Sequence, residues 1–192
     1  MNRSLLLLAL CQGFFLTNNV VFIAINGLVG LSLAPLGWMA TLPVTGYVVG
    51  GALSAPLVAA TQSRFGRKRV FVWALAGFTI ASLFCGLADS LAFEVFARLI
   101  QGMCGAFIIP LSQAITLDTY PPEQHGRAMA FWGTGAVCGS MIGPTIGGYV
   151  TEYMSWRYIF YLNIPFGILA WLGILAFVPE TVKNPKHRLD WF

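Results

Sequence analysis

Residues 132–150 read Trp-Gly-Thr-Gly-Ala-Val-Cys-Gly-Ser-Met-Ile-Gly-Pro-Thr-Ile-Gly-Gly-Tyr-Val, and this stretch decides the fold class. Glycine recurs in it at every fourth position, at Gly135, Gly139, Gly143 and Gly147. On a helix these glycines form one bare stripe that drifts by about 40° per step. In water such a helix would be poor, because each interior glycine costs about 1 kcal/mol relative to alanine and a proline costs about 3 kcal/mol. In a bilayer the backbone keeps its internal hydrogen bonds and a second helix can pack closely, so the stretch predicts a transmembrane helix.

The composition agrees with a membrane protein. Hydrophobic residues make up 57% of the 192 residues and charged residues only 9%, whereas soluble domains carry about 25% charged residues. No Asp, Glu, Lys, Arg or His lies between Ser4 and Ser63. At about 20 apolar residues per crossing, that segment holds two helices and a tight turn.

The remaining apolar runs predict an all-α bundle of six transmembrane helices over residues 1–178. Charged clusters, prolines and glycines separate the runs and mark the turns. The helices are expected at about 5–31, 37–60, 70–88, 91–117, 127–150 and 158–178, and residues 179–192 are expected to form a cytoplasmic tail or a linker to a second half.

The cations predict the orientation. If the six helices alternate in direction, Arg157 lies alone on one side, and Arg98 lies within the fourth helix. By the positive-inside rule the opposite, cation-rich side is cytoplasmic, so both termini are expected in the cytoplasm of a multi-pass protein of the cell (inner) membrane. The cations occur in scattered clusters beside apolar runs, which argues against a nucleic-acid partner. The cytoplasmic set is Arg3, Arg64, Arg67, Lys68, Arg69, Arg127, Lys183, Lys186 and Arg188.

The glycine stripe also carries a family resemblance. Gly139-x3-Gly143-Pro144-x2-Gly147-Gly148 resembles the antiporter motif in the fifth helix of major facilitator superfamily exporters. A general small-residue packing face is the alternative. The resemblance implies the N-terminal six-helix half of that fold, built as two three-helix repeats. It places helices 1 and 4 around a central cavity, and helices 2 and 5 with their glycines against a second six-helix half. The residues expected to form the motif are Gly135, Gly139, Gly143, Pro144, Gly147 and Gly148.

The fourth helix carries a second resemblance. Arg98-x2-Gln101-Gly102 is similar to the motif that the superfamily associates with proton coupling. A buried guanidinium needs a partner, and the alternative is that Glu94, one turn earlier, neutralises it as an i,i+4 pair. Residues 156–167 resemble the start of the sixth helix in multidrug efflux pumps of the EmrB and QacA kind, the drug:proton antiporter branch. Those pumps usually carry an Asp in helix 1, where this chain has Thr17.

The loop between helices 2 and 3 carries a third resemblance. Its Arg-x-Gly-Arg-Lys sequence is similar to the superfamily's loop signature, whose cations interact with the cytoplasmic ends of neighbouring helices. Ala59 and Ser63 stand where the signature has Gly and Asp, and a plain positive-inside loop is the alternative. We expect Arg67 to pair with Asp118 at the end of helix 4. The residues of this expected gating loop are Arg64, Gly66, Arg67, Lys68 and Asp118.

Polar residues at helical spacing on helices 1 and 4 are candidates for the cavity wall. Side chains at this depth face protein or water, and hydrogen bonds between helices would explain them as well as contact with a substrate. The candidates are Gln12, Asn19, Asn26, Ser112, Gln113 and Thr116.

These patterns predict a transporter and not an enzyme. No nucleophile lies with a base, no paired carboxylates occur, no P-loop is present, and the cysteines lack metal-ligand spacing. We therefore expect no cofactor and no metal, and a proton gradient as the driving force. The predicted function is export of small amphipathic compounds by proton antiport. The alternatives are an uptake carrier, or a non-transporting half-bundle that assembles with a partner membrane domain.

Overall fold

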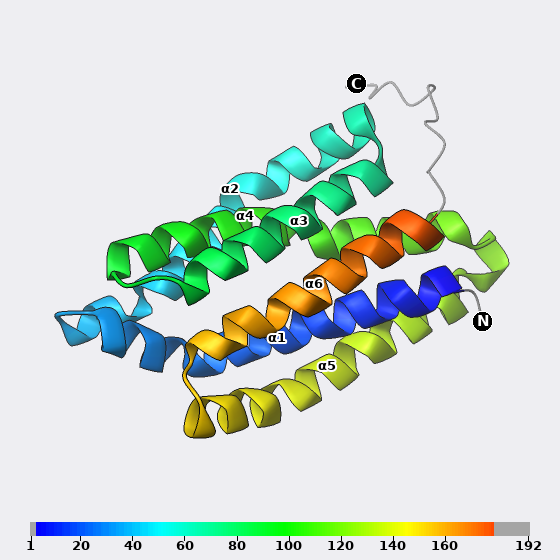
Figure 1. Ribbon diagram of the computed structural model, residues 1–192. Helices are drawn as coiled ribbons and strands as arrows, with labels where there is room; N and C mark the ends of the chain where they lie inside the picture. The colour runs from blue at the N-terminus through cyan, green and yellow to red at the C-terminus, as the bar shows by residue number, and fades with distance from the viewer. Residues whose placement is uncertain (1–2, 179–192) are drawn as a thin grey trace.

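The computed structural model describes the backbone of residues 3–178 and the side chains of residues 5–25 and 27–178. Over these residues the chain forms six long helices and no strand (Figure 1), so the expected all-α bundle is confirmed. The expected tail at 179–192 lies outside the described residues. The helices are α1 (Arg3–Leu33), α2 (Leu42–Phe65), α3 (Arg67–Gly86), α4 (Leu91–Thr119), α5 (His125–Tyr153) and α6 (Arg157–Phe177), with short 3-10 helices η1 (Gly37–Thr41) and η2 (Pro122–Gln124) before α2 and α5.

Local sequence explains where the helices end. Gly66 separates α2 from α3 with a φ of 89°, a left-handed conformation that glycine adopts readily. The Ser90 hydroxyl caps α4 by accepting a hydrogen bond of 3.3 Å from the Phe93 amide. α2 continues to Phe65, beyond the expected end at residue 60, because the polar residues that follow mark the edge of the apolar segment and do not stop a helix.

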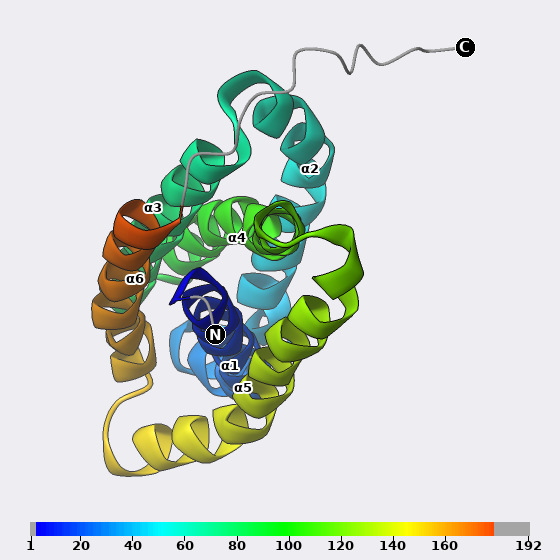
Figure 2. The ribbon, with the colours of Figure 1, turned by 90° about the vertical axis from the view of Figure 1, so that its right-hand side faces the viewer.

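The helices lie in two layers. α5, α1, α4 and α2 form a row in that order, and α6 and α3 lie side by side against α1 and α4. Figure 2, which views the bundle from one end, shows α3 and α6 on one flank, α2 on the opposite side, and α1 and α4 between them. The most extensive contacts join α1 with α5 and α2 with α4, so each of the first two helices packs on a helix of the second half of the chain.

Five segments of the described residues are long and apolar enough to cross a membrane: Leu5–Ile25, Gly37–Phe65, Arg67–Gly86, Leu91–Thr119 and Arg157–Phe177. The α5 helix is not among them, although it has 29 residues. Seven of these residues are glycine, which contributes length but little hydropathy. α5 therefore differs from the other five long helices in being glycine-rich and less apolar.

The glycine stripe of α5 packs against α1 of the same bundle. A Cβ atom added to Gly143 would lie 3.0 Å from the Thr17 carbonyl oxygen, and one added to Gly139 would collide with the backbone of Gly13. The expectation that the stripe faces a second half is therefore wrong. A stripe of glycines predicts that another helix packs closely against it, but not which helix. Here the partner is α1, which has Ala9 opposite Gly135 and Gly13 opposite Gly139. Gly148 has nothing within 4 Å of its would-be Cβ, and Pro144 is exposed.

A second close contact joins α2 and α4. Cβ atoms added to Gly50 or Gly102 would collide with the backbones of Leu99 and Tyr47 respectively. The Ser54 hydroxyl donates a 3.0 Å hydrogen bond to the Met103 carbonyl oxygen on α4. The glycines of α2 thus also face inward, and the α1–α5 and α2–α4 contacts are called the two glycine seams below.

Candidate functional site

Arg98, in the first third of α4, is the centre of a buried polar network. It is 1% exposed, and Glu94 and Gln101 are both 0% exposed. The Arg98 Nε donates to Glu94 Oε1 over 3.1 Å, and its Nη1 donates to Gln101 Oε1 over 3.2 Å. Gln101 Nε2 in turn donates to the Ser82 hydroxyl on α3 over 2.7 Å. The network thus joins α4 to α3 and holds a cation and a carboxylate inside an apolar bundle.

Two aromatic rings cover the guanidinium of Arg98. Its Cζ lies 3.8 Å from the centroid of Phe22 on α1 and 4.6 Å from that of Phe160 on α6. The negative faces of aromatic rings attract a cation, and the attraction grows when water is excluded. Arg98 therefore contacts α1 and α6 directly through the two rings, and Gln101 links it to Ser82 on α3.

The structure shows the i,i+4 pair between Glu94 and Arg98, which the sequence left as an alternative to proton coupling. The pair is incomplete, because Glu94 Oε2 and Arg98 Nη2 make no hydrogen bond with the described residues. Gly102, the last residue of the expected coupling motif, lies in the α2–α4 seam. The motif therefore divides into two polar residues of the network and one packing residue.

The expected gating loop lies at the end of the bundle that carries the α2–α3 turn. Arg67 forms an ion pair with Asp118 at the end of α4, as the sequence predicted. Lys68 Nζ donates to the Leu175 carbonyl oxygen at the end of α6 over 3.1 Å. Arg64 lies over the ring of Phe65, and Gly66 forms the turn. The two cations thus join the ends of α4 and α6 to the start of α3.

The expected cavity residues of α4 are mostly buried in helix contacts. Ser112 accepts a 2.8 Å hydrogen bond from Trp132 Nε1 on α5, and the Thr116 hydroxyl donates to the Ser112 carbonyl oxygen over 2.8 Å. Both side chains are 0% exposed. Gln113 is half-buried. These positions favour the hydrogen-bonding interpretation for Ser112 and Thr116.

Of the expected cavity residues of α1, Gln12 and Asn19 do not line the cavity between α1, α5 and α6 that is described below. Gln12 is 1% exposed, and its Oε1 makes no hydrogen bond with the described residues. Asn19 donates to the Phe15 carbonyl oxygen one turn earlier over 2.8 Å. The side chain of Asn26 lies outside the described residues.

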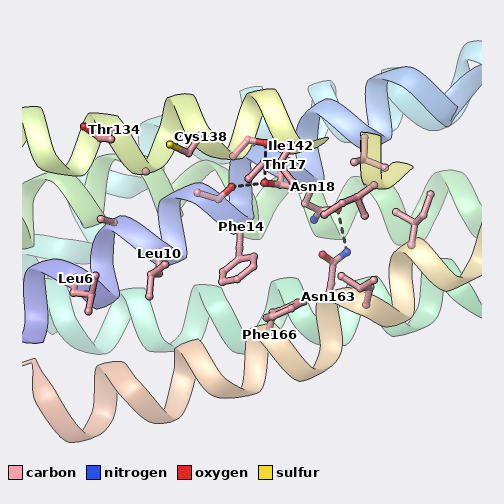
Figure 3. A pocket seen from close by; sticks show the side chains of 18 of the residues that line it. Leu6, Leu10, Phe14, Thr17, Asn18, Thr134, Cys138, Ile142, Asn163 and Phe166 are labelled. Carbon is pink, nitrogen blue, oxygen red and sulfur yellow. Dashed lines mark hydrogen bonds between the residues drawn. The ribbon is translucent and has the colours of Figure 1, made fainter. Parts of the chain in front are cut away.

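A cavity between α1, α5 and α6 has a volume of about 390 Å³ (Figure 3). Its polar lining includes Thr17, Asn18 and Asn163, none of which the sequence singled out as cavity residues. The signal was present in the Thr-Asn-Asn run of α1 and in Asn163 of the sixth-helix motif. Asn19 was the predicted cavity residue of that run because Gln12, Asn19 and Asn26 recur every seven residues, but its neighbour Asn18 lines the cavity.

Comparison with known proteins identifies the family to which the chain belongs. The model of the Major Facilitator Superfamily matches residues 5–191. The chain is 36% identical to the multidrug export protein EmrB of Haemophilus influenzae over 89% of this chain and 34% of that protein. It is also 36% identical to the fatty acid resistance protein FarB of Neisseria gonorrhoeae, over 88% of this chain and 31% of that protein. The chain thus spans about a third of the length of these curated relatives.

Solved structures show the same fold. The D-xylose-proton symporter matches with a TM-score of 0.78 at 17% identity, covering 93% of this chain and 48% of that chain. The human organic anion transporter MFSD10 matches with a TM-score of 0.77 at 20% identity, covering 94% and 48%. At these identities the likeness concerns the fold alone, and the described bundle corresponds to about half of each transporter. With the family model matched from residue 5 to residue 191, this chain belongs to the Major Facilitator Superfamily.

Proposed function

We propose that this chain forms the N-terminal half of a secondary transporter that exports small amphipathic compounds in exchange for protons. The observation that carries the proposal is the 36% identity to a multidrug export protein over 89% of the chain. Transporters of this architecture rock one bundle against another around a shared site. A second six-helix bundle, on the same polypeptide or on a partner, is therefore part of the proposal.

Glu94 is the group that we propose to carry the proton. Among the described residues it is the only buried carboxylate, since Asp89, Asp118, Glu123 and Glu152 are exposed. Ionisable residues inside a membrane protein are costly and generally mark ion or substrate pathways. Glu94 thus supplies the acidic group that Thr17 does not supply on the first helix. Arg98, one helical turn further along α4, is its paired cation.

The chemistry of the pair supports a coupled exchange. A proton that binds Glu94 neutralises the carboxylate and leaves Arg98 as a buried cation without a counter-ion. An unpaired buried charge is strongly unfavourable, so protonation favours a rearrangement that brings Arg98 to water. Release of the proton restores the pair. The protonation state of Glu94 thus selects between two arrangements of Arg98, which a proton-coupled cycle requires.

The test uses vesicles that hold the chain together with its second half, and it measures ethidium movement and drug-induced proton release. We expect outward-directed exchange, and we expect Glu94→Gln to reduce drug-induced proton release at least tenfold. The matched control is Glu152→Gln, an exposed carboxylate on α5, which should leave both signals unchanged. Normal proton release by Glu94→Gln would contradict the proton assignment while leaving export intact.

The direction and dependence of the flux separate the other functions. If the vesicles show that the substrate is accumulated inward together with protons, the chain belongs to an uptake carrier and the export proposal is wrong. Tight association with a second bundle, but no flux in any arrangement, would identify an assembly role and contradict the transport proposal.

A further inference from the structure

The cavity between α1, α5 and α6 is separate from the Arg98 network and has the features of a binding site. Its volume of about 390 Å³ falls within the range of about 300–1,000 Å³ that is usual for small-molecule pockets. No charged side chain of the described residues lines it. Figure 3 shows α1 between the other two helices, with apolar side chains around the space. Main apolar contributors are Leu6, Leu10, Phe14, Cys138, Ile142 and Phe166.

One residue on the wall of this cavity, Asn18, carries a hydrogen-bond donor without a partner. Asn163 Nδ2 donates to Asn18 Oδ1 over 3.1 Å, which fixes the Asn18 amide in place. Asn18 is 5% exposed, and its Nδ2 makes no hydrogen bond with the described residues. The hydroxyl of Thr17, by contrast, is occupied by the carbonyl oxygens of Gly13 and Gly139. A buried donor without an acceptor is unfavourable, so the site favours a ligand that brings an acceptor.

The depth of Asn18 restricts the source of that acceptor. Asn18 is the middle residue of α1, about 22 Å from either end of the helix. The hydrocarbon core of a bilayer is about 30 Å thick, so the ester groups of lipids lie about 15 Å from its middle. The acyl chain of a lipid in its usual position can fill the cavity, but it brings no acceptor to this depth.

We propose that the cavity binds a neutral, apolar molecule that carries its own hydrogen-bond acceptor, such as an aromatic ketone. Its oxygen accepts from Asn18 Nδ2, and its apolar body lies between α1, α5 and α6. Phe14 and Phe166 stack with ring centroids 4.2 Å apart and offer a flat aromatic surface at the same place. An ionic ligand is disfavoured, because the lining holds no counter-charge. The proposal goes beyond the proposed transport and does not depend on it, because binding is measured directly.

The first experiment maps the site with benzophenone, a neutral ketone that labels neighbouring C–H bonds under light. The 192-residue chain is placed in lipid nanodiscs, and labelled residues are identified by mass spectrometry. We expect label on α1, α5 and α6 around the cavity, and a loss of at least tenfold in Cys138→Trp, which fills it. The control is Met141→Trp, on the same helix but 74% exposed and outside the lining. Thr134→Trp provides a second filling variant if Cys138→Trp elutes as aggregate.

The second experiment tests the acceptor with two competitors of the same ring shape, fluorenone and the hydrocarbon fluorene. One neutral hydrogen bond corresponds to about a fivefold preference for fluorenone over fluorene in the wild type. Asn18→Leu should abolish this preference while retaining binding of fluorene. Equal competition by the two compounds in the wild type would overturn acceptor recognition and identify simple filling by hydrocarbon. Uniform labelling of all lipid-facing helices, unaffected by either filling variant, would overturn the site itself.

Discussion

The Thr17 hydroxyl donates to the carbonyl oxygen of Gly139 across the α1–α5 seam, over 2.8 Å. This bond is possible because the glycine lets the two backbones approach. Its counterpart in the α2–α4 seam is the bond from Ser54 to Met103. Each seam thus combines glycine contacts with one hydroxyl that crosses to the facing backbone. Membrane helices depend on such packing, because the lipid supplies no hydrophobic drive between them.

We predict that Gly139→Leu disrupts the bundle, because its side chain would enter the space occupied by the Gly13 backbone. The yield of monodisperse protein in detergent should fall at least fivefold. Gly133→Leu is the matched control, on the same helix and with nothing within 4 Å of its would-be Cβ. Equal yields from the two variants would show that the α1–α5 seam is not a tight contact.

The Glu94–Arg98 pair should be far more sensitive to truncation than an exposed pair. Glu94→Ala leaves a buried unpaired cation, and we expect it to lower the free energy of unfolding by about 3–5 kcal/mol. Asp89→Ala, which breaks the ion pair of Arg157 with a carboxylate 90% exposed, should cost less than about 1 kcal/mol. Denaturation in mixed micelles measures both. Adding Arg98→Met to Glu94→Ala should restore much of the loss, and failure of this rescue would contradict an electrostatic cause.

The hydrogen bond from Trp132 to Ser112 joins α5 to α4 in the buried interior. Ser112→Ala leaves the indole N–H without its acceptor and should lower the free energy of unfolding by about 1–3 kcal/mol. Trp132→Phe should produce a loss that does not add to it in the double variant. Full additivity of the two losses would show that the bond contributes nothing to stability.

Asp118 offers a test of the gating loop that separates stability from transport. Its ion pair with Arg67 is partly exposed, with side-chain exposures of 37% for Arg67 and 32% for Asp118, so Asp118→Asn should change the free energy of unfolding by less than about 1 kcal/mol. If the loop controls the transport cycle, the same variant should change the flux of the complete transporter several-fold. Glu123→Gln, an exposed carboxylate of the neighbouring turn, is the control. An unchanged flux would show that the loop does not control transport and that its cations only set the orientation of the helices in the membrane.

The sequence predicted the six helices and their approximate ends, because apolar length, prolines and charges are local signals. It also predicted the Arg67–Asp118 ion pair, which follows from which helix ends share one side of the membrane. The i,i+4 spacing likewise identified Glu94 as a partner of Arg98. All these inferences need only spacing along one helix or alternation across the membrane.

The sequence did not predict which helices face each other. The glycine stripe of α5 was correctly identified as a close-packing surface, but its partner is α1 and not a second half. The stripe alone does not indicate which helix packs against it. Asn18 was missed for a related reason. It differs from Asn19 by one position, about 100° of helical rotation, and only the placement of α6 with Asn163 shows which of the two lines a cavity.

The two glycine seams determine how this bundle can deform. The backbones of α1 and α5 are in direct contact, and so are those of α2 and α4. Each helix pair therefore moves as one rigid unit, called a rod here. The α1–α4 boundary between these rods is much narrower than either seam, and sliding is therefore easiest there. Phe22 of one rod rests on Arg98 of the other at this boundary. If Glu94 carries the proton as proposed, its change of charge acts at the boundary between these two rods.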